Sequence, residues 1–310
     1  MSVFFVEEIN DWLDSEVISK VKISTYDSYK YRISKYVCPR FEKRKIEGIT
    51  SDEIQDLVLN LEGARIKRKL SPSTVDGIFV ILSRFFERCV EKGIIVDNPC
   101  LNIALPKRKR KRVIVLSMEE RRAIVEELQK NVEPKACLVA VALLTGMRLG
   151  ELCSLKWKNV DLRNKRIYVK NTKRRIYTEA NKTKVITTSP KTEDSTRTIP
   201  ITSFIVKQLR KLPSHGSEYV FSKNNGTGYD NRSIQKYFER LMKRLEIKDK
   251  NFHTLRHTFA TSAVESNMDI KTLSMILGHS NVTTTMNLYV HPNEMHTRNA
   301  MEKLSTYIVD

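Results

Sequence analysis

An arginine in the second half of the chain stands where proteins often bind phosphate. Arg148 lies in TGMRLGEL, between two glycines and at the predicted start of a helix. Helix starts present free backbone N–H groups and partial positive charge, and both suit a phosphate. The guanidinium adds a planar, bidentate fork for phosphate oxygens. Arg148 could equally pair with a neighbour such as Glu151, so the residue alone leaves both interpretations open.

A second group of candidates lies in HTLRHTFA. His253 and Arg256 are three residues apart and share one face of a predicted helix. The arginine can donate charge-assisted hydrogen bonds, and the histidine can move a proton near neutral pH. His257 stands four residues after His253, the spacing of a metal-binding pair. No Glu lies between them, however, and Arg256 would put its cation beside the metal. We therefore expect no metal site, and we expect His257 to be a packed structural histidine.

A histidine in a turn and a tyrosine complete the set. His279 lies in LGHSN, and Tyr289 follows ten residues later in the predicted helix TTTMNLYV. A lone tyrosine is usually a half-buried core residue. Tyr289 is a candidate because it follows the arginine and histidine motifs described above. A phenol is a weak nucleophile at its ordinary pKa of about 10 and needs help to lose its proton.

Helix signals dominate the first 104 residues, for which we predict a four-helix domain. The first helix is expected over residues 3–18. Three more are expected to open at Ser24–Asp27, at the capping box of Thr50 and Glu53, and at Ser71–Pro72. Gly93 is expected to end the last of them. The prolines and charges that follow predict a linker over residues 105–115.

Residues 116–310 are predicted to form a second domain of mixed structure. Ser117 caps a helix, and a buried helix follows over CLVAVALL. The runs RIYVK, KVITT and RTIPI favour strands and predict a small antiparallel sheet, after which helices resume at Ser233. The expected fold is therefore mainly α with a small antiparallel β-sheet.

The net charge of +19 suits a polyanionic partner. Residues 1–106 have no net charge, whereas residues 113–310 carry +13. The basic run between them is predicted to bind DNA phosphates and consists of Lys107, Arg108, Lys109, Arg110, Lys111 and Arg112. We expect a cytoplasmic protein, because the longest apolar stretch, residues 136–144, is too short to span a membrane and the cysteines show no CxxC pair.

The motifs TGMRLGEL, HTLRHTFA, LGHSN and Tyr289, in this order and at these spacings, resemble the tyrosine recombinases, also called the phage integrase family. The resemblance covers about residues 117–300, and the front half resembles that family's core-binding domain less specifically. SPKTEDSTRTIPI is similar to the β-hairpin that carries the family's lysine, and Lys191 falls in that place. This hairpin resembles the versions in integrases of conjugative transposons and some phages.

The resemblance implies three phosphate-binding residues. Arg148 and Arg256 would hold the non-bridging oxygens of the scissile phosphate, and His279 would donate a further hydrogen bond there. Two guanidiniums would then supply the charge that a metal otherwise supplies at phosphorus. Glu151 would have a supporting, structural part.

The resemblance also implies three residues that make and break bonds. Tyr289 would attack phosphorus and form a 3′-phosphotyrosyl link, with His253 assisting proton transfer at the nucleophile. Lys191 would donate the proton to the leaving 5′-oxygen, a step that typically contributes about 10²–10⁴ in rate. Because one phosphodiester replaces another, the reaction would need no ATP, metal or other cofactor.

The implied function is site-specific DNA recombination on double-stranded DNA by a homo-tetramer that holds two DNA sites, with accessory DNA-bending or directionality proteins as further partners. The chain begins almost directly with the four-helix unit, so we expect no arm-binding domain. The recombinase could serve a mobile element or resolve chromosome dimers. A type IB topoisomerase and a non-catalytic DNA-binding protein are weaker alternatives.

Overall fold

The computed structural model describes residues 3–64, 69–107, 113–130, 133–177, 183–188, 196–213, 216–289 and 294–309. The chain divides into two compact units, of which the first holds residues 1–111 and 176–184 and the second holds residues 112–175 and 185–310. Within the described ranges, no helix combines the length and apolar composition needed to cross a membrane.

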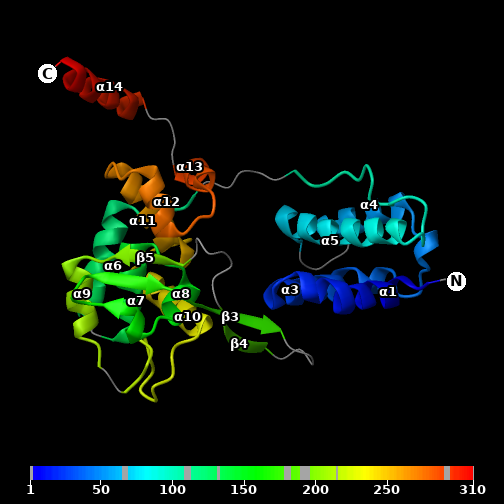
Figure 1. Cartoon of the computed structure of the whole chain (residues 1–310), viewed down its shortest axis with the longest axis horizontal. Coiled ribbons are helices and arrows are strands. Elements are labelled where there is room, and N and C mark those ends of the chain that lie inside the picture. Colours follow the sequence, from blue (N-terminus) through cyan, green and yellow to red (C-terminus); the bar gives the residue numbers. More distant parts are fainter. Residues whose placement is uncertain are drawn as a thin grey trace. The chain divides into compact units, whose positions relative to one another are not determined.

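The first unit is helical (Figure 1). Helix α1 (Phe5–Trp12) continues through a π-helical turn into α2 (Ile18–Lys20), and α3 (Ile23–Tyr36), α4 (Ser51–Leu59) and α5 (Pro72–Glu91) follow. Their apolar faces meet in one core, at the centre of which the aromatic rings of Phe5, Phe41, Phe85 and Phe86 contact one another.

A buried ion-pair cluster also joins α5 to the start of the chain. Arg88 of α5 donates hydrogen bonds to Glu8 of α1 at 2.6 Å and to Glu16 at 2.7 Å. Since Arg88 is buried, each of its hydrogen bonds offsets part of the cost of removing its charge from water.

Helix caps test the sequence-based boundaries of this unit. The capping box of Thr50 and Glu53 and the Ser71 cap are both confirmed, and Gly93 follows the end of α5 with a φ of 69°. The predicted start at Ser24 is wrong, because α3 begins at Ile23 after Lys22 and no side chain caps it.

The second unit opens with α6 (Met118–Lys130), α7 (Pro134–Thr145) and the short α8 (Leu149–Cys153). Ser117 caps α6 as predicted, with a reciprocal hydrogen bond to Glu120. Helix α7 is buried along almost its whole length, as its apolar sequence predicted. The remaining helices are α9 (Ser203–Arg210), α10 (Asn231–Arg244), α11 (His253–Glu265), α12 (Ile270–Leu277), α13 (Val282–Tyr289) and α14 (Glu294–Val309).

The strands form two small sheets. β1 (Val160–Asp161), β2 (Arg166–Val169) and β5 (Arg197–Pro200) pair antiparallel in the order β1-β2-β5, with Ile167 opposite Ile199. β3 (Thr172–Tyr177) and β4 (Thr183–Thr188) form a separate two-stranded sheet. RIYVK and RTIPI are thus neighbours, whereas KVITT lies in the second sheet. The predicted class, mainly α with a small antiparallel sheet, is confirmed.

One helix was missed. We expected helices to resume at Ser233, but α9 already follows the sheet at Ser203 and is capped by the Thr202 hydroxyl. Its buried residues Ile205, Val206 and Leu209 are spaced for one helical face, and the helix packs against α7.

Candidate active site

Four short segments of the second unit bring the predicted site residues together. Arg148 precedes the first turn of α8, and α11 carries His253, Arg256 and His257. Figure 1 shows α11, α12 and α13 grouped beside α8 and β5. Two further predicted residues are His279, between α12 and α13, and Tyr289, the last residue of α13.

A glycine turn sets the position of Arg148. Gly146 ends α7 with a φ of 64°, a left-handed conformation that strains residues with a side chain. A Cβ atom there would lie 2.5 Å from the Phe259 ring and 3.0 Å from a Leu277 methyl group. The Gly146 carbonyl accepts a hydrogen bond from the Arg256 guanidinium at 2.8 Å. The turn therefore needs glycine for both its conformation and its close contacts.

The two guanidiniums converge on the end of α12. Arg256 Nη2 donates to the Leu277 carbonyl at 2.8 Å, and Arg148 Nη1 donates to the same oxygen at 3.3 Å. Arg148 Nη2 donates to the Gly278 carbonyl at 3.1 Å. Arg256 is only 2% exposed, whereas the Arg148 side chain is 38% exposed. Burial and then the nearby Arg148 lower the pKa of Arg256 to about 9. The two guanidiniums thus lie close together in a site that the exposed part of Arg148 leaves partly open.

Glu151 binds the arginines around this site. It accepts a bond from the Arg148 backbone N–H at 2.9 Å and one from the Arg148 guanidinium at 3.0 Å. Arg197, the first residue of β5, binds both Glu151 oxygens at 3.1 and 2.8 Å, and both side chains are 5% exposed. Burial alone would raise the pKa of Glu151, but the arginines outweigh it and hold that pKa below its ordinary value.

Arg197 was missed by the sequence analysis. Its Nε also donates to the Ile276 carbonyl at 2.6 Å, so one side chain joins β5, α8 and α12. The sequence did contain a signal for Arg197. In a strand, residues two apart share a face, and Arg197 is two residues before the core residue Ile199.

For Arg148, the two open interpretations prove compatible, because it pairs with Glu151 and still keeps an exposed side.

His279 is held as one tautomer. Its Nε2 lies 2.8 Å from Arg256 Nη2 and its Nδ1 lies 2.8 Å from the Thr285 hydroxyl. A guanidinium can only donate, so we assign Nε2 as the acceptor and place the proton on Nδ1. Burial, followed by repulsion from Arg256 and Arg148, lowers the pKa of His279 to about 4. In this state His279 cannot donate from Nε2.

Tyr289 has a partner that the sequence analysis did not expect. Its hydroxyl lies 2.6 Å from Nδ1 of His257, and its ring is 5% exposed among Ala260, Leu273 and other apolar residues. Burial raises the pKa of Tyr289, partly offset by Arg256 and Arg148, and burial followed by Arg256 lowers the pKa of His257. The neutral phenol therefore donates to a neutral imidazole. His257 thus contacts the candidate nucleophile, a contact that the sequence did not predict.

His253 lies at the edge of the site. Its ring packs edge to face on His257, with 4.6 Å between centroids, while the residue remains exposed. Desolvation of the packed side, and then His257 and Arg256, lower its pKa. A cavity of about 270 Å³ lies alongside and is lined by Met147, Leu149, Asn231, Gln235, Asn251, Phe252, His253 and Arg256. The small exposed part of Arg256 thus borders a cavity.

The remaining predicted site residues are not placed in this site. Lys191 lies outside the described residues, as do five residues of the basic run: Arg108, Lys109, Arg110, Lys111 and Arg112. Lys107 is described and is exposed.

Comparison with protein families identifies both halves of the chain. Residues 115–296 match the model of the phage integrase family, and residues 4–61 match the phage integrase N-terminal SAM-like domain. A tyrosine recombinase XerC-like protein of Caldanaerobacter subterraneus subsp. tengcongensis is 28% identical, covering 97% of this chain and 82% of that protein. The ICEBs1 integrase of Bacillus subtilis is also 28% identical, covering 94% of this chain and 81% of that integrase.

Solved structures share the fold. The Tn1549 transposon integrase in complex with a circular intermediate DNA superposes with a TM-score of 0.78 at 20% identity, covering 96% of this chain and 99% of that one. A lambda integrase tetramer bound to a Holliday junction gives a TM-score of 0.69 at 20% identity, covering 91% and 79%.

Proposed function

This chain belongs to the phage integrase family of tyrosine recombinases, enzymes that cleave and rejoin DNA, and we propose that Tyr289 is its nucleophile in site-specific strand exchange for a mobile element. The observation that carries the proposal is the convergence of Arg148 and Arg256 on the Leu277 carbonyl, with Tyr289 hydrogen-bonded to the helix that bears Arg256. Cations and nucleophile thus belong to one site.

The guanidiniums are proposed to bind the scissile phosphate. Arg148 keeps an exposed side, and Arg256 lines the cavity beside His253. A phosphate there would relieve the repulsion between the two cations and would be held in place before charge develops at phosphorus. For His279 to donate a hydrogen bond there, Nε2 must gain a proton and give up its contact with Arg256, because a guanidinium can only donate.

His257 is the proposed immediate proton acceptor for Tyr289, in place of the role that we expected for His253. A general base must reach the proton that it removes, and the 2.6 Å contact satisfies this condition. The raised pKa of the phenol and the lowered pKa of His257 keep the proton on Tyr289 in the DNA-free enzyme. The nucleophile is therefore unreactive until the site changes. His253, exposed beside the cavity, is proposed to contact the bound phosphate.

Lys191 remains the proposed acid for the leaving 5′-oxygen, on the resemblance of its segment to the family's hairpin. Breaking one phosphodiester while forming a phosphotyrosine conserves the bond energy. The proposed reaction therefore uses no ATP, and the two arginines supply the charge for which other enzymes use a metal.

The proposed working form is a homo-tetramer on two sites in double-stranded DNA, because each exchange cuts four strands and each chain carries one nucleophile. The lambda integrase tetramer on a Holliday junction supports this by analogy of fold. Helix α14 exposes Met301, Leu304 and Ile308, an apolar set suited to docking on a neighbouring subunit. Residues 107–112 are proposed to bind DNA phosphates.

Chromosome-dimer resolution is the alternative function. To decide, the purified protein would be incubated with fragments of its host's DNA in EDTA, and the covalently attached DNA would be sequenced, with Tyr289→Phe as the control. We expect adducts at one short site at the ends of a mobile element. A single chromosomal resolution site would favour the alternative. Absence of Tyr289-dependent adducts would overturn the proposed function, and adducts that need added Mg²⁺ would refute the metal-free reaction.

A further inference from the structure

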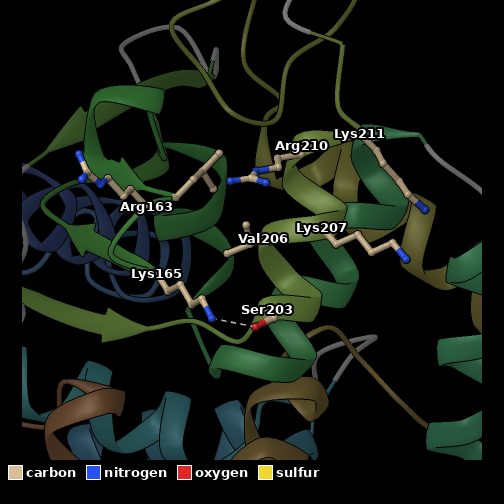
Figure 2. Close-up of a pocket in the computed structure, with 8 residues that line it drawn as sticks. Arg163, Lys165, Ser203, Val206, Lys207, Arg210 and Lys211 are labelled. Atoms are coloured by element: carbon tan, nitrogen blue, oxygen red, sulfur yellow. Dashed lines mark hydrogen bonds between the residues drawn. The ribbon is translucent and has the colours of Figure 1, made fainter.

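A groove lined by basic side chains lies on the second unit, between α9 and the turn that joins β1 to β2 (Figure 2). This basic groove has a volume of about 610 Å³ and is lined by Leu162, Arg163, Lys165, Ser203, Val206, Lys207, Arg210 and Lys211. Five of these side chains are cationic and none is a carboxylate. In Figure 2, Arg210 extends from α9 toward the turn that carries Arg163.

The positive charge of the groove is not neutralised locally. Its five cations are exposed, and among the residues that the structure describes none of the five forms an ion pair. Lys165 donates to the Ser203 hydroxyl at 2.9 Å, a neutral partner. The nearby acid Asp161 instead accepts hydrogen bonds from Asn164 at 2.8 and 2.7 Å. The cations therefore repel one another unless an anion binds.

Helix stability explains only part of this arrangement. Cations in the last turn of a helix offset its dipole, which accounts for Lys207 and Arg210 at the end of α9. Arg163 and Lys165 come from a different element, the β1–β2 turn, and line the same groove. The helix dipole does not explain these two cations, and a basic lining contributed by two elements indicates a binding surface.

The groove is separate from the active site. β5 starts at Arg197, which binds Glu151, and ends at Pro200, which pairs with Arg166 next to the groove. A four-residue strand extends about 10–13 Å, so the two places lie toward opposite ends of the strand. No lining residue of the groove belongs to the active site, so an anion in the groove is not the scissile phosphate.

We propose that the basic groove binds the phosphate backbone of a DNA duplex, without reading its sequence, as a second contact apart from the active site. Arg, Lys and Ser side chains are among the groups that contact DNA phosphates. An acidic protein partner fits less well, because the groove offers no aromatic anchor and only Leu162 and Val206 as apolar lining. This binding site rests on the proposed function, under which DNA is the ligand, and gives the DNA a second place to bind.

The test uses the full-length protein and a labelled duplex of about 40 base pairs of arbitrary sequence, since non-specific binding is electrostatic. The groove variant is Lys207→Gln/Arg210→Gln/Lys211→Gln. The matched control is Lys223→Gln/Lys243→Gln/Lys248→Gln, three exposed lysines outside the groove with the same loss of charge. Binding constants are measured over a range of salt concentrations, and unfolding is followed for all three proteins to verify the fold.

We compare the slope of log K against log[salt] for the two variants. In the groove variant this slope should be smaller in magnitude than in the control, by about 0.9 for each phosphate that the groove variant no longer binds. Independently, the duplex should protect Lys165, Lys207 and Lys211 of the wild type from acetylation, but not the lysines of the control set. Equal slopes for the two variants, or unprotected groove lysines, would overturn the proposal. Protection by polyglutamate but not by the duplex would assign the groove to an acidic protein instead.

These measurements are independent of catalysis. Tyr289→Phe should show the same slope and the same protection as the wild type, because neither measurement requires a covalent bond. Failure to form adducts would therefore count against the proposed function alone. If the duplex does not protect the groove lysines, that result would count against the groove alone.

Discussion

The hydroxyl of Tyr289 lies 2.6 Å from Nδ1 of His257, so the candidate nucleophile is held by the residue that directly follows Arg256. The phosphate-binding arginine and the tyrosine's partner are thus consecutive on α11. Any movement of this helix changes both the phosphate site and the position of the nucleophile.

His257→Phe should keep the ring volume and remove the acceptor. If His257 takes the proton, adduct formation should slow by about 10²–10⁴ with DNA binding nearly unchanged. His253→Phe is the matched control and should slow the reaction less. Single-turnover cleavage of the mapped site measures both. A larger defect in His253→Phe would return the proton transfer to His253.

His279 should make stability depend on pH. An unfolded histidine titrates at about 6.5, whereas the folded residue has a pKa of about 4. Between these values the unfolded chain binds more protons, so this contribution is complete above about 6.5 and falls as the pH drops toward 4. His279→Gln should remove about 1–2 kcal/mol of that dependence.

Urea unfolding at several pH values in that window measures the effect. Titration of Glu151 and His257 occurs in both proteins and cancels in the difference. Parallel stability curves for the wild type and His279→Gln would show that His279 is not held neutral.

Arg197→Ala should destabilise the second unit strongly. It leaves the buried Glu151 carboxylate with Arg148 as its remaining charged partner, and breaking a buried pair costs about 3–5 kcal/mol. Arg244→Ala is the control, because its pair with Glu127 is exposed on the arginine side and should contribute less than about 1 kcal/mol. Denaturant unfolding compares the two. If both variants lose similarly little unfolding free energy, Arg197 does not stabilise the second unit.

Gly146→Ala should cost more than the backbone conformation alone. Gly216 has the same φ of 64°, but a Cβ atom added there would meet no other atom within 4 Å, so Gly216→Ala isolates the conformational cost of about 1–2 kcal/mol. At Gly146 the clash with Phe259 adds about 1–3 kcal/mol and shifts Arg148. Equal unfolding free energies for the two variants would refute the close contact.

Lys191→Ala should slow cleavage while leaving DNA binding nearly intact. A substrate with sulfur in place of the 5′-oxygen has a leaving group that needs no proton, so it should restore cleavage by the variant. The measurement is the cleavage rate of both substrates by both proteins. If sulfur does not restore the rate, Lys191 is not the acid.

Local sequence determined the elements and much of the candidate list. Caps at Thr50, Ser71 and Ser117 depend on neighbours three residues away, so their helices were predictable from the sequence. The spacing of His253 and Arg256 placed them on one helix for the same reason. The order of the motifs indicated the family before any fold was known, because each motif is itself a short, local pattern.

Tertiary structure alone decided which residues meet. Arg197 and Glu151 are 46 positions apart, and His257 and Tyr289 are 32 apart. No local pattern encodes such pairs, because they depend on how β5, α8, α11 and α13 pack. The same holds for the choice between His253 and His257: both lie on α11, and only the packing of α13 against that helix brings one of them to the tyrosine.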